Sequence, residues 1–430
     1  MPPDCYDEEV DFKKLALKDL ELAKFVSVNG SIDFRDPDAL TALTKALLKR
    51  DFGIIIDLPP DRLCPPVPIR YHYIRWIQDL LDTTSSDFDD YFDPNRQVVG
   101  VDIGTGASAI YPLLGLSSRA NWRFIATEID EKSAEYAQKN VFANGLSTRC
   151  HVMSVYDSSP VIPDMKADFT MCNPPFYDSR AEMDVHRDAK EKRPSAICTG
   201  ADTEMVCPGG DAGFILRMVE ESVLLGDRYQ WYTSMFGKWS SVQVVVEDLK
   251  KRGVTNWAVG VLKTSGRTMR WVVGWSFRDL RPRDEVARAN ISGMAGMRAL
   301  LPKPTELAMK ARDPPHVTGQ KITAALSQLR LFWSGWQHQR GKMFGVGFAL
   351  ENVWSRSARN RQKKREIAGI EDGEEEVAAL STKEGRKRAV FGFRVDVREE
   401  EKEVVVRWLK GWDYVMFESF CGVVKKAVDS

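Results

Sequence analysis

An apolar strand that runs directly into a glycine turn is the feature that most restricts what this chain can fold into. Residues 96–103 read as a buried strand, and the next residues are Gly104-Thr-Gly-Ala-Ser108. Glycines at such a turn let the backbone approach a ligand closely. The turn lacks the third glycine and the lysine of the phosphate-binding loops, which disfavours a nucleotide pyrophosphate as its ligand. The pattern therefore predicts an α/β sheet with a ligand site at the end of this strand.

Acidic residues accompany the strands that surround this turn. A second apolar strand, 122–127, ends in Glu128, about twenty residues beyond the glycines, where open α/β sheets place a carboxylate that receives ribose hydroxyls. Strand-like and helical segments then alternate as far as Cys172. Asp102 and Asp157 also lie at predicted strand ends, where such sheets bind ligands. We expect Asp102 to meet the amino group of a cationic amino-acid cofactor.

Asn173-Pro-Pro-Phe176 follows the apolar run 167–172. An Asn side-chain oxygen and a main-chain carbonyl can both accept hydrogen bonds from one planar NH2 group, while the aromatic ring covers the base or amide that carries it. Because the lone pair of such a nitrogen is delocalised, positioning must replace base catalysis. Both prolines stiffen the turn. The motif predicts a pocket for methylating a nitrogen with S-adenosylmethionine, and a purely structural Asn-Pro-Pro turn is the alternative.

Longer motifs lie between residues 67 and 271. They read Val67-Pro-Ile-Arg-Tyr-His-Tyr-Ile-Arg-Trp76, Asp102-Ile-Gly-Thr-Gly-Ala-Ser108, Ile110-Tyr-Pro-Leu-Leu-Gly115, Ala126-Thr-Glu128, Met171-Cys-Asn-Pro-Pro-Phe176, Trp231-Tyr232 and Gly266-Arg-Thr-Met-Arg-Trp271. Together they resemble the methyltransferase-like 16 family, over about residues 25–280. That family comprises eukaryotic adenine-N6 methyltransferases of U6 small nuclear RNA, related to a bacterial enzyme of 23S ribosomal RNA.

The resemblance implies a role for each residue of the site. Asn173 and Pro174 would hold the target N6 amino group, Phe176 would stack on the adenine, and Pro175 would shape the turn. The implied contacts to S-adenosylmethionine come from Arg70, Gly104, Gly106, Ser108, Glu128, Asp157 and Asn173. Among these, Arg70 would pair with the methionine carboxylate. Because Arg70 follows Cys64-Pro-Pro-Val-Pro68, we expect it on a stiff arm that reaches across a cleft.

Basic residues point to the substrate. Arg267 and Arg270 precede the apolar strand 271–277 and are placed to grip RNA phosphates or stack on bases. In the family, arginines at these positions contact the RNA. Lys238 is a further candidate for RNA binding, with a merely solvated lysine as the alternative.

The predicted organisation has several parts. A class I Rossmann-like methyltransferase domain of the α/β class spans 66–280, after a small N-terminal helical module at 1–65. A proline-containing linker, 281–315, leads to a C-terminal α+β module at 316–430, for which we expect RNA binding. Its charged loop, 355–388, is interpreted either as an RNA-gripping or nuclear-localising segment or as a solvated loop. Within the modules, residues 54–56 are expected to form a strand and residues 400–410 a helix.

Composition narrows the remaining possibilities. The formal net charge of the 430 residues is +0, so RNA binding must depend on local basic patches. The seven cysteines show no CxxC spacing, so we expect no structural metal site. Cysteines that remain reduced thiols fit a nuclear location, with the cytoplasm as the alternative. No apolar run reaches the length of a membrane span, so we expect no membrane partner. No heptad pattern suggests a partner helix, so we expect a monomer.

Three functions remain in competition. The first is an RNA adenine-N6 methyltransferase acting on structured RNA, either U6 small nuclear RNA or ribosomal RNA. The second is a glutamine-N5 protein methyltransferase, since an amide NH2 needs the same pocket, although that class usually has Tyr where this chain has Phe176. The third is a non-enzymatic RNA-binding regulator that uses the same fold as a clamp.

Overall fold

The chain forms two compact units in the computed structural model, which describes residues 6–183, 200–263, 269–291, 297–339, 342–358, 360 and 374–430. The first unit consists of Met1–Asp79, Phe92–Arg278 and Arg288–Leu301. The second consists of Leu80–Tyr91, Asp279–Ala287 and Pro302–Ser430. The predicted domain boundary at residue 280 falls beside the division between Arg278 and Asp279. The predicted linker, 281–315, is divided between the two units.

A seven-stranded sheet organises the first unit, in the order β3-β2-β1-β4-β5-β7-β6. Its strands are β1 (Val98–Ile103), β2 (Trp122–Glu128), β3 (Cys150–Ser154), β4 (Ala167–Cys172), β5 (Tyr229–Phe236), β6 (Asn256–Leu262) and β7 (Arg270–Ser276). The first five pair in parallel, whereas β7 runs antiparallel to β5 and β6. Every residue of β5 is buried, as expected for a strand covered on both faces. The predicted α/β fold class is therefore confirmed.

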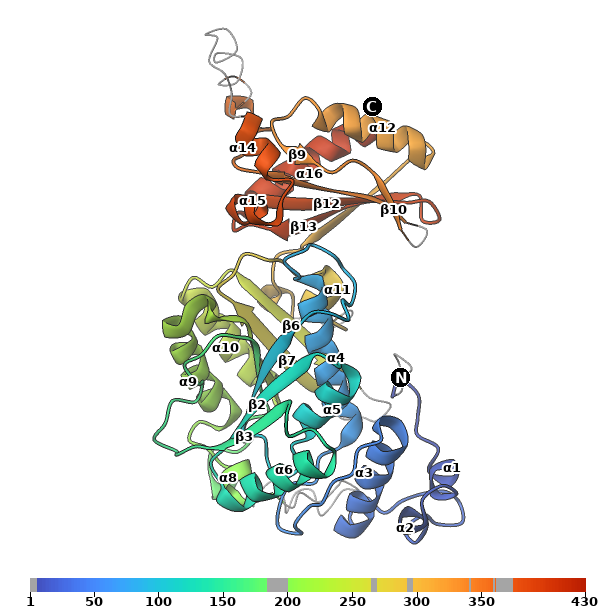
Figure 1. The fold of residues 1–430 in the computed structure, drawn as a ribbon, viewed down its shortest axis with the longest axis vertical. Helices are drawn as coiled ribbons and strands as arrows, with labels where there is room; N and C mark the ends of the chain where they lie inside the picture. The colour runs from blue at the N-terminus through green and yellow to red at the C-terminus, as the bar shows by residue number, and fades with distance from the viewer. Residues whose placement is uncertain are drawn as a thin grey trace. The chain divides into compact units, whose positions relative to one another are not determined.

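Helices cover both faces of this sheet (Figure 1). The helices of this unit are α1 (Phe12–Ala16), α2 (Leu20–Ala23), α3 (Pro37–Phe52), α4 (Val67–Thr83), α5 (Ile110–Ser118), α6 (Glu131–Ala143), α8 (Asp202–Met205), α9 (Gly210–Leu225), α10 (Trp239–Lys251) and the 3-10 turns η1 (Gly226–Arg228) and η2 (Arg298–Leu300). α9 and α10 lie on one side of the sheet, and α4 and α5 lie on the other. The carboxyl ends of β1, β2 and β4 consequently meet at one edge of the sheet, where the predicted site residues lie.

The segment predicted as a strand at Ile54–Ile56 joins no sheet. Asn144 of the α6 C-cap donates to the Ile55 carbonyl over 2.6 Å and accepts from its N–H over 2.9 Å. Asn140 makes the same pair of bonds with Asp57, at 2.7 and 2.9 Å. The strand prediction was wrong because side-chain amides replace a neighbouring strand as the hydrogen-bonding partner.

A six-stranded sheet forms the second unit, in the order β10-β11-β12-β13-β8, with β9 also pairing with β11. Its elements are α11 (Asp284–Ala287), β8 (Glu306–Lys310), α12 (Pro315–Leu326), β9 (Phe332–Trp333), β10 (Gln337–Gln339), β11 (Lys342–Ala349), α14 (Glu374–Ala379), α15 (Lys383–Arg388), β12 (Phe391–Arg398), β13 (Glu403–Lys410) and α16 (Tyr414–Asp429). α12 and α16 contact each other and the sheet. They enclose an aromatic core around Phe393, Trp408 and Phe420.

Two segments of this unit differ from their predicted structure. Residues 400–410 were predicted as a helix, but Glu403–Lys410 is the strand β13. Its run Val404-Val-Val406 is β-branched and buried. Such residues favour a strand that pairs with a neighbouring strand on each side, and they disfavour a helix. The other segment, Glu306–Lys310, lies in the predicted linker and is the edge strand β8, which pairs with β13. Within the predicted charged loop 355–388, the helices α14 and α15 form, and residues 359 and 361–373 lie outside the described residues.

Candidate functional site

A cavity opens at the carboxyl edge of the first unit's sheet and encloses about 1050 Å³, counting its open mouth. A cavity of this size accommodates a small-molecule cofactor. Its lining includes the predicted cofactor residues Arg70, Gly104, Gly106, Ser108, Glu128, Asp157 and Asn173. Pro174 and Pro175 line it as well, whereas Phe176 lies outside it. The fold thus brings together residues that are up to about a hundred positions apart in the sequence.

The glycine turn after β1 forms one wall. Gly104 and Gly106 have φ values of +69° and +64°, a left-handed conformation that a side chain would strain. The N–H groups of Gly104 and Thr105 both donate to the Thr127 carbonyl over 3.0 Å, which ties the turn to the end of β2. The backbone of the turn therefore stays close to the cavity, as the sequence pattern predicts.

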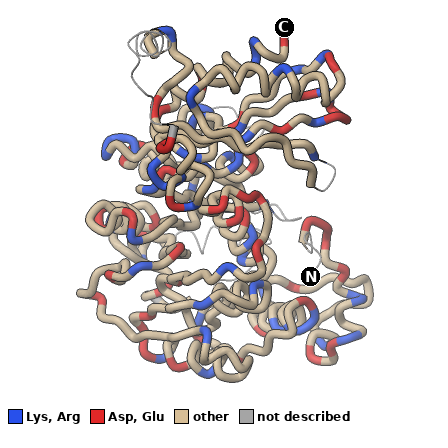
Figure 2. Tube along the Cα trace, turned by 45° about the horizontal axis from the view of Figure 1, so that its top comes forward, with Lys and Arg blue, Asp and Glu red and all other residues tan. Residues whose placement is uncertain are grey.

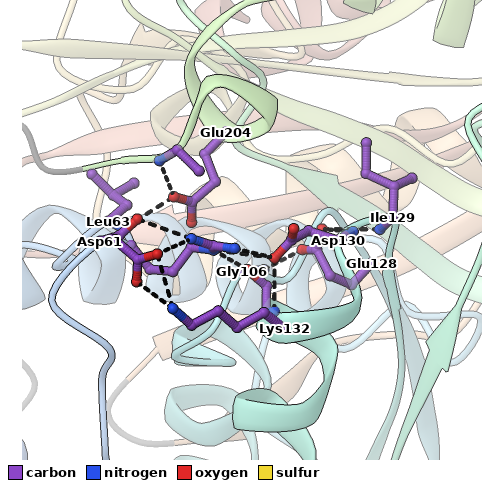
Figure 3. Close-up of polar contacts among 11 residues, drawn as sticks. Asp61, Leu63, Gly106, Glu128, Ile129, Asp130, Lys132 and Glu204 are labelled. Carbon is purple, nitrogen blue, oxygen red and sulfur yellow. Dashed lines mark hydrogen bonds and ion pairs between the residues drawn. The ribbon is translucent and has the colours of Figure 1, made fainter.

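Glu128 presents a fixed carboxylate at the next strand end (Figure 3). Its Oε2 accepts from Gly106 N–H over 2.8 Å, and its Oε1 accepts from the N–H groups of Ile129 and Asp130 over 2.9 and 3.0 Å. Burial raises the pKa of Glu128, and these backbone donors oppose that rise. The result is a rigid hydrogen-bond acceptor at the cavity wall, suited to ribose hydroxyls.

A buried arginine supports this wall, and the sequence motifs did not point to it. The Arg62 guanidinium donates to Asp130 Oδ2 over 3.1 and 2.8 Å and to Ser133 Oγ over 3.0 Å. It also pairs with Asp61, whose carboxylate accepts from Lys132 over 2.8 Å (Figure 3). The network joins the segment before α4 to the first turn of α6. It therefore holds in place the backbone next to Leu63, which lines the cavity.

Asp102 is buried completely inside β1 and does not line the cavity. Burial raises its pKa to about 7, with the charge of Glu128 adding to the rise and Thr105 and Arg70 opposing it. The predicted contact with a cofactor amino group is therefore not a direct one in this arrangement. Asp102 instead lies as a buried carboxyl group behind the glycine turn.

Arg70 and Asn173 contact each other across the cavity. Arg70 Nη1 donates to Asn173 Oδ1 over 2.8 Å and to the Tyr111 hydroxyl over 2.7 Å. Because an arginine only donates, the contact turns the amide oxygen of Asn173 toward Arg70 and fixes the orientation of the amide. Arg70 does not lie on a separate stiff arm as predicted, since the prolines before it lead into helix α4, which begins at Val67 and contains Arg70.

Phe176 lies outside the cavity lining and rests on a glycine. A methyl group at Gly237, which follows β5, would lie 2.8 Å from Phe176 Cδ1. The Gly237 N–H donates to Asp211 Oδ2 over 3.1 Å, and the other oxygen of Asp211 accepts from Ser241 Oγ over 2.6 Å. A buried carboxylate on α9 thereby holds the backbone on which the ring lies. Neither Asp211 nor Gly237 belongs to a motif that predicted this.

The side chain of Arg270 lies beside this aromatic ring. The Arg270 guanidinium lies 5.6 Å from the centre of the Phe176 ring, and burial lowers its pKa, as does the charge of Arg70. Lys238 pairs with Glu182 over 2.7 Å. Arg267 falls outside the described residues. Blue and red segments are interspersed along the chain (Figure 2).

The described residues contain neither a metal-binding cluster nor a membrane-spanning helix. No group of three or more His, Cys, Asp or Glu side chains there is arranged to hold a metal ion. None of the helices formed by those residues is long and apolar enough to span a bilayer.

Known proteins resemble this chain closely. A family described as RNA methyltransferase matches residues 2–279. The U6 small nuclear RNA (adenine-(43)-N(6))-methyltransferase of Schizosaccharomyces pombe is 32% identical over 407 residues, which cover 93% of this chain and 96% of that protein.

Solved structures of the human METTL16 protein resemble it as well. The catalytic domain in complex with MAT2A 3'UTR hairpin 1 is 38% identical, with a TM-score of 0.56, and the match covers 64% of this chain and 93% of that one. The N-terminal domain in complex with SAH is 36% identical, with a TM-score of 0.52, over 64% of this chain and 96% of that one.

Proposed function

This chain belongs to the methyltransferase-like 16 family of RNA methyltransferases, and we propose that the RNA on which it acts is U6 small nuclear RNA. It is an S-adenosylmethionine-dependent enzyme that forms N6-methyladenosine in RNA. The choice of U6 is supported by the S. pombe enzyme, because the match extends over nearly all of both chains. A ribosomal RNA remains the second candidate substrate.

The contact of Arg70 with Asn173 is the observation that carries the mechanism. S-adenosylmethionine supplies an electrophilic methyl group when it is bound. Asn173 Oδ1, held by Arg70, has a second lone pair that accepts an N–H of the target amino group, and the Pro174 carbonyl accepts the other. Both acceptors stabilise the positive charge that develops on the nitrogen. No side chain has to deprotonate the amine beforehand, because the proton leaves after the nitrogen has become cationic.

The cavity fits the cofactor on the chemistry of its wall. Glu128 is available for the ribose hydroxyls, and the glycine turn offers backbone at close range. Arg70, Ser108 and Asp157 line the same cavity and are assigned to the cofactor as well. Arg70 is the residue assigned to the carboxylate of the cofactor.

The aromatic side of the site is assigned to the RNA. Phe176 stacks on the target adenine, and Arg270 beside it contacts the RNA backbone or a neighbouring base. Arg267 and Lys238 are assigned to the same strand of RNA. Lys238 first has to leave its ion pair with Glu182, which is exposed enough to exchange at little cost.

The second unit is assigned to the same RNA, outside the target nucleotide. Its support is that the similarity to the S. pombe enzyme continues through it. A nuclear location follows from U6 as substrate, with the cytoplasm as the alternative compartment. We assign the active form as a monomer, which light scattering of the purified protein at increasing concentration will test.

One assay tests the proposed substrate and its alternatives together. The protein is incubated with labelled S-adenosylmethionine and either a U6 hairpin, a ribosomal RNA fragment or a glutamine-bearing protein. The expected result is label on the U6 hairpin, recovered as N6-methyladenosine by nucleoside mass spectrometry. Asn173→Ala should reduce this label about a hundredfold or more. Asn95→Ala, which removes an exposed amide from a loop, serves as the matched control.

Two results would contradict the proposal. Label confined to the protein substrate would indicate glutamine-N5 methylation. Unchanged labelling of RNA by Asn173→Ala would show that Asn173 is not the acceptor of the target amino group. Preferential labelling of the ribosomal fragment would keep the reaction and replace the substrate.

A further inference from the structure

Glu204 is a carboxylate in the wall of the cofactor cavity to which neither the motifs nor the mechanism assigns a role. It lies on the short helix α8, between the Asn173–Phe176 turn and α9. The cavity lining includes it together with Leu63 and Gly106. Its position in the sequence gives no hint of this, because it lies about a hundred residues from the glycine turn.

One oxygen of Glu204 joins two segments of the cavity wall. Its Oε2 accepts from the Leu63 N–H over 3.1 Å and from the Ala201 N–H over 2.9 Å (Figure 3). Backbone hydrogen bonds also hold α8 independently of this side chain. The Tyr177 N–H donates to the Met205 carbonyl over 3.0 Å, and the Tyr177 carbonyl accepts from the Cys207 N–H over 3.0 Å. A change at Glu204 that keeps an acceptor oxygen therefore leaves the segment in place.

The other oxygen faces the glycine turn. Glu204 Oε1 lies 3.5 Å from the position that a Cβ atom on Gly106 would occupy. It accepts no hydrogen bond from the described residues. Burial raises the pKa of Glu204, and the charge of Glu128 adds to that rise, while the Leu63 and Ala201 donors and Arg62 oppose it. An incompletely compensated carboxylate at a cavity wall favours a bound cation.

We propose that Glu204 is a further cofactor-binding residue, and that its carboxylate favours the cationic methyl donor over the uncharged product. The inference rests on the proposed S-adenosylmethionine-dependent activity. S-adenosylmethionine carries a sulfonium, which makes its net charge one unit more positive than that of S-adenosylhomocysteine. A negative wall therefore stabilises the donor more than the product, which helps the product to leave after each turnover.

Binding of two probes to the full chain tests this without RNA or turnover. Sinefungin carries an ammonium group where the donor has its sulfonium, and S-adenosylhomocysteine carries a neutral thioether. Isothermal titration calorimetry gives the Kd of each probe for the wild-type protein, for Glu204→Gln and for Glu135→Gln. Glu135 is an exposed residue of α6 outside the cavity lining, and its substitution makes the same change in charge.

Glu204→Gln should raise the Kd for sinefungin about tenfold, while the Kd for S-adenosylhomocysteine changes less than about threefold. Glu135→Gln should leave both values unchanged within about twofold. Unchanged thermal melting of the unliganded variant will show that its fold is intact. Glu204→Ala also removes the acceptor for the Leu63 N–H. It should weaken the binding of both probes and speed their dissociation in stopped-flow measurements.

Equal loss of affinity for both probes in Glu204→Gln, or no loss for either, would overturn the inference and leave the proposed activity standing. A wild-type protein that bound neither probe would instead contradict the proposed cofactor itself. The two failures are therefore distinguishable in one experiment.

Discussion

Replacing Gly237 by alanine should impair catalysis without touching the cofactor cavity. The new Cβ atom would lie 2.8 Å from Cδ1 and 3.2 Å from Cε1 of Phe176. Carbon atoms normally approach to about 3.5–4.0 Å, so the ring has to move by roughly 1 Å. The backbone cannot yield easily instead, because Gly237 N–H is bonded to the buried Asp211.

The expected size of the effect follows from stacking and alignment. Stacking of a base on an aromatic ring is worth about 1–3 kcal/mol, which corresponds to a factor of roughly 5 to 150. A misplacement of about 1 Å can cost about a hundredfold in rate. We therefore expect kcat/KM for the RNA to fall about 10- to 100-fold. The Kd for S-adenosylhomocysteine should stay within about twofold, because neither Gly237 nor Phe176 lines the cavity.

Two measurements test this prediction. Methyl transfer to a U6 hairpin measures the fall in kcat/KM, and the fluorescence of 2-aminopurine placed at the target adenine measures the stacking of the base. Stacking on Phe176 quenches the probe, and the variant should quench it less. Gly422→Ala is the control, because a Cβ atom there meets nothing within 4 Å. Wild-type activity in Gly237→Ala, or loss of cofactor binding together with activity, would refute the reasoning about the ring.

Three further predictions concern the scaffold. Asn140→Ala removes hydrogen bonds to the Asp57 N–H, the Asp57 carbonyl and the Ala107 carbonyl, and should lower the free energy of unfolding by about 2–4 kcal/mol in urea denaturation; a loss below about 0.5 kcal/mol would show that the docked segment contributes little. Asp102 has a folded pKa of about 7 against an ordinary 3.8, so the folded state binds its proton more tightly and stability falls as pH rises between these values, by up to about 4 kcal/mol. Asp102→Asn should flatten that part of the pH profile of thermal melting, and an unchanged profile would contradict the assignment. Asp90→Asn should destabilise the second unit by about 3–5 kcal/mol, because Asp90 is buried against Arg394 and Arg407; unchanged melting would show that these arginines are satisfied without it.

Local patterns predicted much of the candidate site. The apolar strands, the glycine turn, Glu128 and Asn173–Phe176 are each visible within a few residues of sequence, because strand ends and turns are defined by neighbouring side chains. Placing them at one edge of a sheet required only the rule that parallel strands share their carboxyl ends. The helix predicted at 400–410 was wrong, because the burial of β-branched residues in a strand paired on both sides decided the structure of this segment.

The sequence by itself determined the sheet, the cofactor class and the methylation of a planar amino nitrogen, since these depend on contiguous motifs. Only the tertiary structure decided that Arg70 orients Asn173, that Gly237 supports Phe176, and that Glu204 and Arg62 complete the cavity wall. These contacts join positions that are tens to more than a hundred residues apart, and hydrogen bonds and packing at such separations have no periodic trace in the sequence. The glycine turn that opens the site is thus a local feature, whereas its electrostatic environment is a product of the fold.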